Sequence, residues 1–351
     1  MLDLRSLGVL EQHTKRELAA LLSTARCEHL LTLRAVLVEE RANGVTLDVT
    51  NEGRQMPLQN QNLGPDDVQL VAGWLCSRVP AEKLASVDLS RNFVFGRKDL
   101  HCGEEFSPMG TPLRQSVRTA GVDVGRSGDL QMRVHTVDEC QTGWTDLTAA
   151  LQESGVGSLI LCGIGMGPIG LRSLAKALLD GLRCLETLDL SENYLRDSRE
   201  IGSGKGSVSL KAFSAFCHAL VGTGVKRLDL ACCGIDAAAL GFLPEPPVDA
   251  AGVKSAKDLS AATGARYPLS NSPVLQLRSL NLRGNPLTNS EPYHSTALEN
   301  YAPRDLRYPS SQVKTELRLD RDLIGLHRLC HALSKSRLLT RLDLSACRCS
   351  V

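Results

Sequence analysis

Three short stretches of this sequence contain residue types that could do chemistry, and the first contains glycines. Gly165, Gly167 and Gly170 form a GxGxxG pattern after the apolar segment 158–162, and Asp189 ends the next apolar segment. In a dinucleotide-binding enzyme, such glycines bring backbone amides to a pyrophosphate at a helix N-terminus, and the acid binds the ribose. The pattern often matches by chance. Because the strand, the turn and the acid also fit a sequence repeat, we favour the repeat over a cofactor site.

The second stretch is GSGKGS at 202–207, which is similar to a phosphate-binding loop. Arg199 stands where such a loop needs its first glycine, and Gly206 stands where Ser or Thr would bind magnesium. We therefore interpret the stretch as a linker. No Ser, His and Asp arrangement or paired-carboxylate motif stands out elsewhere.

The third stretch contains His327, Cys330 and His331 at helical spacing, so that one helix face could present all three to a zinc ion. Cys330 also falls in the apolar stripe of the same predicted helix. A packed thiol between two surface histidines is therefore favoured over a closed site with four ligands. We predict no catalytic residue, no cofactor and no metal.

The elements that position these residues follow from a recurring frame of eleven residues. The clearest copy is LETLDLSENYL, 185–195, with leucine at positions 1, 4, 6 and 11 and Asn193 at position 9. Leu188 and Leu190 alternate with polar neighbours, which is the period of a half-buried strand, and the amide of Asn193 can bond backbone groups at the following turn. Further copies start at Leu84, Val156, Val225, Leu277 and Leu339, a weaker copy starts at Lys314, and a degenerate copy ends at Leu63.

Between the frames, apolar residues recur at helical spacing. These stripes predict helices over 68–75, 144–154, 169–182, 210–220 and 323–333. Alternating strands and helices indicate an α/β fold, a repeat solenoid with irregular insertions.

Two regions are expected along the chain. Residues 1–62 would form an N-terminal helical cap and a degenerate first repeat, and residues 63–351 the repeat region, with insertions at about 95–137, 236–272 and 288–312. The last frame lacks a polar cap, so we expect a partner, or further chain, to cover this C-terminal repeat.

Composition excludes several classes of function. With 40 Lys and Arg against 39 Asp and Glu, the net charge is +1, which provides no bulk basic field for a nucleic acid. No apolar run approaches the roughly 18 residues of a membrane-spanning helix, and Asp3, Glu11 and Glu17 argue against a signal or transit peptide. Several of the 12 cysteines fall on inward-facing frame positions, which favours thiols in a reducing cytoplasm.

The LxxLxLxxN/CxL segments and their helices, about half of the chain, resemble the ribonuclease-inhibitor-like leucine-rich-repeat family. This resemblance implies a curved solenoid with parallel strands on the concave face and helices on the convex face. It also implies a scaffold or adaptor, not an enzyme, that binds protein partners through the concave face. We expect such a protein in the cytoplasm or attached to a cytoskeletal or ciliary assembly. The family includes GTPase-activating proteins for Ran, so a regulator of a small GTPase is the alternative.

Frame positions 2, 3, 5, 7 and 8 point away from the apolar side of the predicted sheet and are the candidates for partner contact. At position 5 acids dominate, and these are equally compatible with contact or with a framework role. Arginine is enriched in interface hot spots, and we expect Arg227, Arg278, Arg283 and Arg341 to line one strip. The full set of candidates is Asp88, Arg91, Glu186, Asp189, Glu192, Arg227, Asp229, Arg278, Asn281, Arg283, Arg341 and Asp343.

Overall fold

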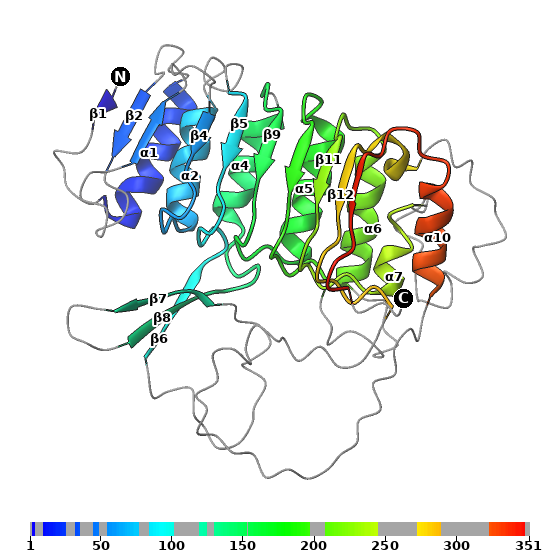
Figure 1. Ribbon diagram of the computed structural model, residues 1–351. Helices are drawn as coiled ribbons and strands as arrows, with labels where there is room; N and C mark the ends of the chain where they lie inside the picture. Colours follow the sequence, from blue (N-terminus) through cyan, green and yellow to red (C-terminus); the bar gives the residue numbers. More distant parts are fainter. Residues whose placement is uncertain are drawn as a thin grey trace, which may run out of the picture.

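A seven-stranded parallel sheet forms the centre of the computed structural model (Figure 1). Its strand order is β13-β12-β11-β10-β9-β5-β4. The strands are β4 (Gln55–Pro57), β5 (Ser86–Asp88), β9 (Ser158–Ile160), β10 (Thr187–Asp189), β11 (Arg227–Asp229), β12 (Ser279–Asn281) and β13 (Arg341–Asp343). The structure describes residues 2–3, 10–25, 32–35, 45–48, 55–76, 84–101, 119–124, 130–152, 154–196, 208–244, 272–288 and 323–347.

Each strand spans positions 3 to 5 of one frame. Neighbouring strands pair in register, so that Leu188 lies beside Leu159 on one side and Leu228 on the other. The degenerate frame that ends at Leu63 supplies β4, which pairs with β5. The weaker copy from Lys314 lies outside the described residues. The frame therefore predicted both the strands and their register.

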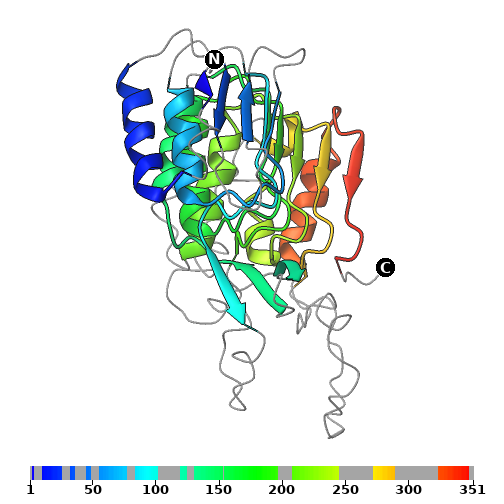
Figure 2. The same cartoon turned by 90° about the vertical axis from the view of Figure 1, so that its left-hand side faces the viewer.

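Helices cover one face of this sheet (Figures 1 and 2). We call the opposite face, which carries frame positions 3 and 5, the open face. Its edge at the amino ends of the strands also carries position 2. The helices are α1 (Gln12–Ala25), α2 (Pro65–Leu75), α4 (Thr142–Gln152), α5 (Pro168–Asp180), α6 (Val208–Leu220), α7 (Ala237–Leu240) and α10 (Ile324–Leu333), with a short 3-10 helix, η6 (Pro273–Gln276).

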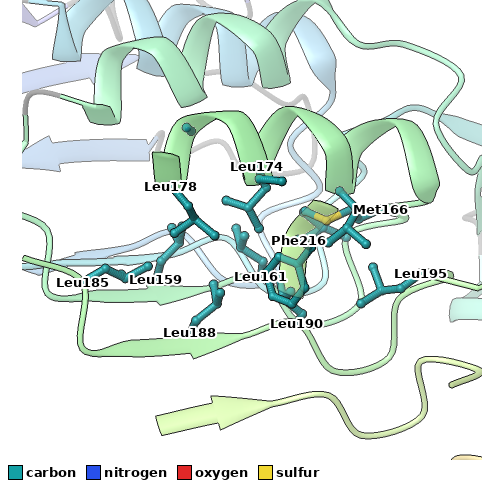
Figure 3. Close-up of a cluster of buried hydrophobic side chains, with 14 of the residues drawn as sticks. Leu159, Leu161, Met166, Leu174, Leu178, Leu185, Leu188, Leu190, Leu195 and Phe216 are labelled. Carbon is teal, nitrogen blue, oxygen red and sulfur yellow. The ribbon is translucent and has the colours of Figure 1, made fainter. Parts of the chain in front are cut away.

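The core lies between the sheet and these helices. Leu188 and Leu190, at positions 4 and 6, are fully buried, and so is Leu174 of α5 (Figure 3). Full burial of a leucine side chain stabilises the fold by about 1.5–3 kcal/mol. The alternation of buried and half-buried residues along each strand therefore follows from the helices covering a single face.

Asn193, at frame position 9, is buried and fully hydrogen-bonded. Its Oδ1 accepts from the backbone amides of Ile164 (3.2 Å) and Met166 (3.0 Å), and its Nδ2 donates to the carbonyls of Leu161 (2.7 Å) and Leu190 (2.9 Å). Three of these groups belong to the turn of the preceding frame. One side chain thus satisfies backbone groups that would otherwise be buried without partners.

The same arrangement recurs along the sheet. Asn92 and Asn285 each accept from two amides of the preceding turn and donate to one carbonyl of that turn and one of their own. Where position 9 is cysteine, the thiol donates to the preceding turn, from Cys233 to Leu190 O and from Cys347 to Leu282 O, both at 3.1 Å. We call this series the position-9 ladder.

At the N-terminal end, α1 lies against α2. An ion pair joins Lys15 to Asp67 at 2.5 Å, and Arg16 binds Asp66 at 2.7 Å. Burial raises the pKa of Asp67, an effect that Lys15 partly offsets. Beside this end of the sheet, β1 (Leu2–Asp3), β2 (Thr32–Ala35) and β3 (Val45–Asp48) form a small separate sheet. The boundary near residue 62 stays a prediction.

The expected insertion at about 95–137 contains a sheet of its own. Its strands β6 (Arg97–His101), β7 (Thr119–Val124) and β8 (Leu130–His135) are antiparallel, in the order β6-β8-β7, and lie below the main sheet in Figure 1. The chain leaves and returns at one point, because the amide of Thr136 donates to Gly96 O (3.2 Å) and that of Cys140 to Phe95 O (3.0 Å). Because no copy of the frame falls in this region, the sequence did not predict this sheet.

The start of the expected insertion at 236–272 belongs to the packed layer instead. Asp236 caps α7 by accepting from the amide of Ala239 at 2.8 Å, and Phe242 and Leu243 are fully buried. Residues 245–271, and residues 289–322 around the third expected insertion, lie outside the described part of the chain.

The edge strand β13 offers a matched test of the core. Leu342 occupies the same frame position as Leu188, but it is 39% exposed where Leu188 is fully buried. We expect Leu188→Ala to lower the free energy of unfolding by about 2–5 kcal/mol because it opens a cavity. Leu342→Ala should lower it by about 1 kcal/mol. Urea denaturation measures both, and equal losses would contradict the described packing.

Candidate protein-binding surface

One row of side chains on the open face comes from frame position 5. The strand register places these residues side by side. In strand order the row reads Asp88, Ile160, Asp189, Asp229, Asn281 and Asp343. The acidic row expected from the sequence is therefore interrupted by Ile160 of β9.

These position-5 side chains have a framework role. In the five polar ones, Oδ1 accepts from the backbone amide two residues later, which closes a turn at the end of the strand. The pairs, with the accepting side chain first and the residue of the donating amide second, are Asp88 and Ser90, Asp189 and Ser191, Asp229 and Ala231, Asn281 and Arg283, and Asp343 and Ser345, at 2.9–3.0 Å. Because Oδ1 is occupied, a partner would bind the aspartates mainly through the other carboxylate oxygen, Oδ2. In Asp229, Oδ2 already accepts a hydrogen bond from Asn281 Nδ2 (2.8 Å).

The electrostatic environment changes along this row. Burial raises the pKa of Asp189, the bonds from Ser191 oppose this, and the nearby carboxylates of Asp229 and Asp88 raise it further. At the other end of the sheet, the pKa of Asp343 is lowered by hydrogen bonds from Ser345 and by nearby arginines. The centre of the row is thus an unfavourable place for negative charge, and its C-terminal end a favourable one.

Frame position 8 adopts the left-handed backbone conformation, with φ of +58° at Arg91, +61° at Gly163 and +59° at Glu192. A Cβ at Gly163 would lie 3.8 Å from the Cβ of Glu192 and 3.9 Å from Cγ of Arg91. Both predicted contact residues therefore flank a glycine at the carboxyl ends of the strands.

The basic residues separate into two places. Arg227 and Arg341 lie at position 3 and Arg278 at position 2, so all three are at the amino ends of β11, β12 and β13, and all three are exposed. Arg283 lies at position 7, beyond the carboxyl end of β12, roughly 10 Å or more along the chain direction. The prediction that these four arginines line one strip is wrong for Arg283, because its frame position belongs to the turn.

Two further residues complete the amino-end group. Lys226 forms an ion pair with Glu186 of the neighbouring frame, and Arg227 Nε donates to Thr187 Oγ1 at 2.9 Å. The pKa of Glu186 is lowered mainly by Lys226, with smaller contributions from Arg227 and Arg278. Lys226 was not among the residues expected from the sequence, although position 2 of its frame would have identified it.

Residues 276–297 match the family model Leucine Rich Repeat. The match begins one residue before the frame at Leu277 that forms β12, and it supports a leucine-rich-repeat protein. Leucine-rich-repeat domains generally mediate protein–protein interactions and are generally not enzymes. No curated protein matches the chain. Among the described helices, none has the length and apolar character needed to cross a bilayer.

Two of the three glycines of the GxGxxG pattern, Gly167 and Gly170, serve packing, and Gly165 forms a turn with φ of +82°. Asp138 Oδ1 accepts from the amides of Gly167 (2.9 Å) and Gly170 (3.0 Å), and its Oδ2 accepts from the amide of Ile169 (2.6 Å). A side chain at Gly167 would collide with Asp138, and a Cβ at Gly170 would lie 2.6 Å from Phe95. A carboxylate of the chain itself thus binds the amides that a pyrophosphate would need.

The helix α10 that carries the zinc candidates is rotated relative to the prediction. His327, Cys330 and His331 are all exposed, so Cys330 is not the packed thiol that was predicted. The buried residues are Gly325, Leu329 and Ala332, with Leu326 and Leu333 partly buried against the core. Gly325 lets the helix approach the backbone of α7 closely, which turns Cys330 outward. Among the described residues, no group of three or more His, Cys, Asp or Glu side chains could hold a metal ion. The 202–207 stretch lies outside the described part.

The capping of α5 can be tested directly. We expect Asp138→Ala to lower the free energy of unfolding by about 1–2 kcal/mol, because three amides at the helix N-terminus lose their acceptor. Glu139→Ala, at the exposed neighbouring residue, should change it little. Addition of NAD should not raise the melting temperature of the wild type. Equal stability of the two variants would contradict the capping role of Asp138. Stabilisation by NAD would restore the cofactor hypothesis.

Proposed function

We propose that this protein is a non-enzymatic adaptor that binds a protein partner through the open face of its sheet. On this proposal the repeats form a curved solenoid of the ribonuclease-inhibitor-like class, and the open face is its concave side. The function is binding rather than turnover. In support, Gly167 and Gly170 are accounted for by packing, and His327, Cys330 and His331 are exposed without a further ligand among the described residues.

The observation that carries the proposal is the asymmetry of the sheet. The side of the strands that faces the helices is filled by fully buried leucines such as Leu188. On the other side, no described element covers the row at position 5 or the exposed arginines Arg227, Arg278 and Arg341. Exposed arginines are a common source of binding energy in protein interfaces.

A reducing compartment is consistent with the cysteines. The described ones are free thiols, and Cys217, Cys233 and Cys347 are buried as small apolar side chains. Burial also raises the pKa of Cys162, in the turn after β9, to about 11, so this thiol is protonated at neutral pH. These properties support a place in the cytoplasm.

A matched pair of tryptophan substitutions tests the proposal. Ile160 is half-buried at the centre of the open face, at a position where neighbouring strands carry Asp. Ile160→Trp should therefore preserve the fold and block contact, whereas Lys176→Trp, on the exposed side of α5, should not affect binding.

Affinity purification with quantitative mass spectrometry compares the two variants with the wild type. We expect partners to be lost from Ile160→Trp and retained by Lys176→Trp. The reverse pattern would move the binding surface to the helices and overturn the proposal.

A further inference from the structure

Four cations gather at the amino ends of three neighbouring strands. Arg227 and Arg341 lie opposite Ser279 in the register, and Arg278 directly precedes that serine. Adjacent strands are about 4.8 Å apart, so the backbones of Arg227 and Arg341 are roughly 10 Å apart, and Arg278 lies one residue before the serine between them. Lys226 precedes Arg227. We call Lys226, Arg227, Arg278 and Arg341 the basic strip.

A carboxylate of the chain itself, that of Glu186, already binds to the basic strip. Glu186 forms an ion pair with Lys226, and its pKa is lowered by Lys226 and further by Arg227 and Arg278. The pKa of Asp343 is lowered mainly by hydrogen bonds from Ser345, and further by Arg283 and Arg341. Among the ion pairs of the described residues, the strip contributes Lys226 alone, so its three arginines keep their positive charge available.

The neighbouring row limits which anions fit. Asp189, Asp229 and Asp343 lie at position 5, two to three residues further along the strands and so roughly 7–10 Å from the strip. A continuous polyanion such as a nucleic acid would be repelled there, and the net charge of the chain is only +1. A protein segment differs, because it can direct carboxylates to the strip and a basic or neutral side chain to the acids.

We propose that the basic strip docks an acidic segment of a protein partner, which crosses β11, β12 and β13 at their amino ends and pairs its carboxylates with the arginines. Planar guanidinium groups suit this role because they bind carboxylates with two parallel hydrogen bonds. The inference rests on the proposed function and narrows it, by naming the part of the open face and the chemistry of the partner.

Fluorescence anisotropy with defined probes tests the inference. The probes are a labelled peptide of alternating Glu and Ser, its Lys and Ser counterpart, and a single-stranded oligothymidylate. The variants are Arg278→Glu with Arg341→Glu on the strip, and Arg172→Glu with Lys176→Glu on the exposed side of α5 as the matched control. Circular dichroism and thermal unfolding establish that both doubles are folded.

We expect the acidic peptide to bind the wild type and the α5 control, and its affinity to fall at least about tenfold in the strip variant, which corresponds to about 1.4 kcal/mol. The basic peptide should bind more weakly to the wild type. Failure of the acidic peptide to bind, equal loss in both doubles, or tighter strip-dependent binding of oligothymidylate would each overturn the inference.

The partner-capture assay separates this inference from the proposed function. If Ile160→Trp loses the partners and the strip variant keeps them, the open face is the binding surface and the acidic-segment inference fails. If both variants keep them, the proposed function fails as well. Loss from both, with retention by the α5 control, supports the two together.

Discussion

The position-9 ladder is the interaction on which the rest of this structure depends. A carboxamide can donate and accept at once, so Asn92, Asn193 and Asn285 each satisfy two amides and two carbonyls in two consecutive turns. Backbone at these turns is buried, where an unpaired group costs about 1–3 kcal/mol. The ladder therefore allows turns to stack inside the molecule, and it links each strand to the next except between β5 and β9, where position 9 is the apolar Ile164.

The surface follows from this internal order. Because every strand presents positions 3 and 5 on the same face, a side chain at a given position lies beside its counterparts from neighbouring frames. The repeat itself accounts for the aspartates at position 5, such as Asp189, because their Oδ1 atoms accept hydrogen bonds that close turns. What is particular to this chain is the distribution of the other charges, above all Arg227, Arg278 and Arg341 at one end of the strands. Recognition is thus expected from the residues that the frame leaves variable.

The sequence was sufficient where structure depends on local period, and insufficient where it depends on distant contacts. The strands and most helices follow from the frame and from helical spacing. The sheet of β6, β7 and β8 depends on pairing across long connections, and the cap on α5 comes from Asp138, some thirty residues away. The orientation of α10 depends on the contact of Gly325 with α7. The position of Arg283 could have been corrected from the sequence, since position 7 belongs to the turn, and Lys226 could have been identified from position 2 of its frame.

Hydrogen–deuterium exchange of single amides tests the position-9 ladder most directly. The amides of Met166 and Ile235 donate to the side chains of Asn193 and Asn285, and that of Leu190 donates to the backbone of β11. If the ladder holds the turns together, Met166 and Ile235 should exchange as slowly as Leu190. Exchange of these two amides as fast as that of exposed turns, with Leu190 still protected, would show that the asparagines do not carry this structure.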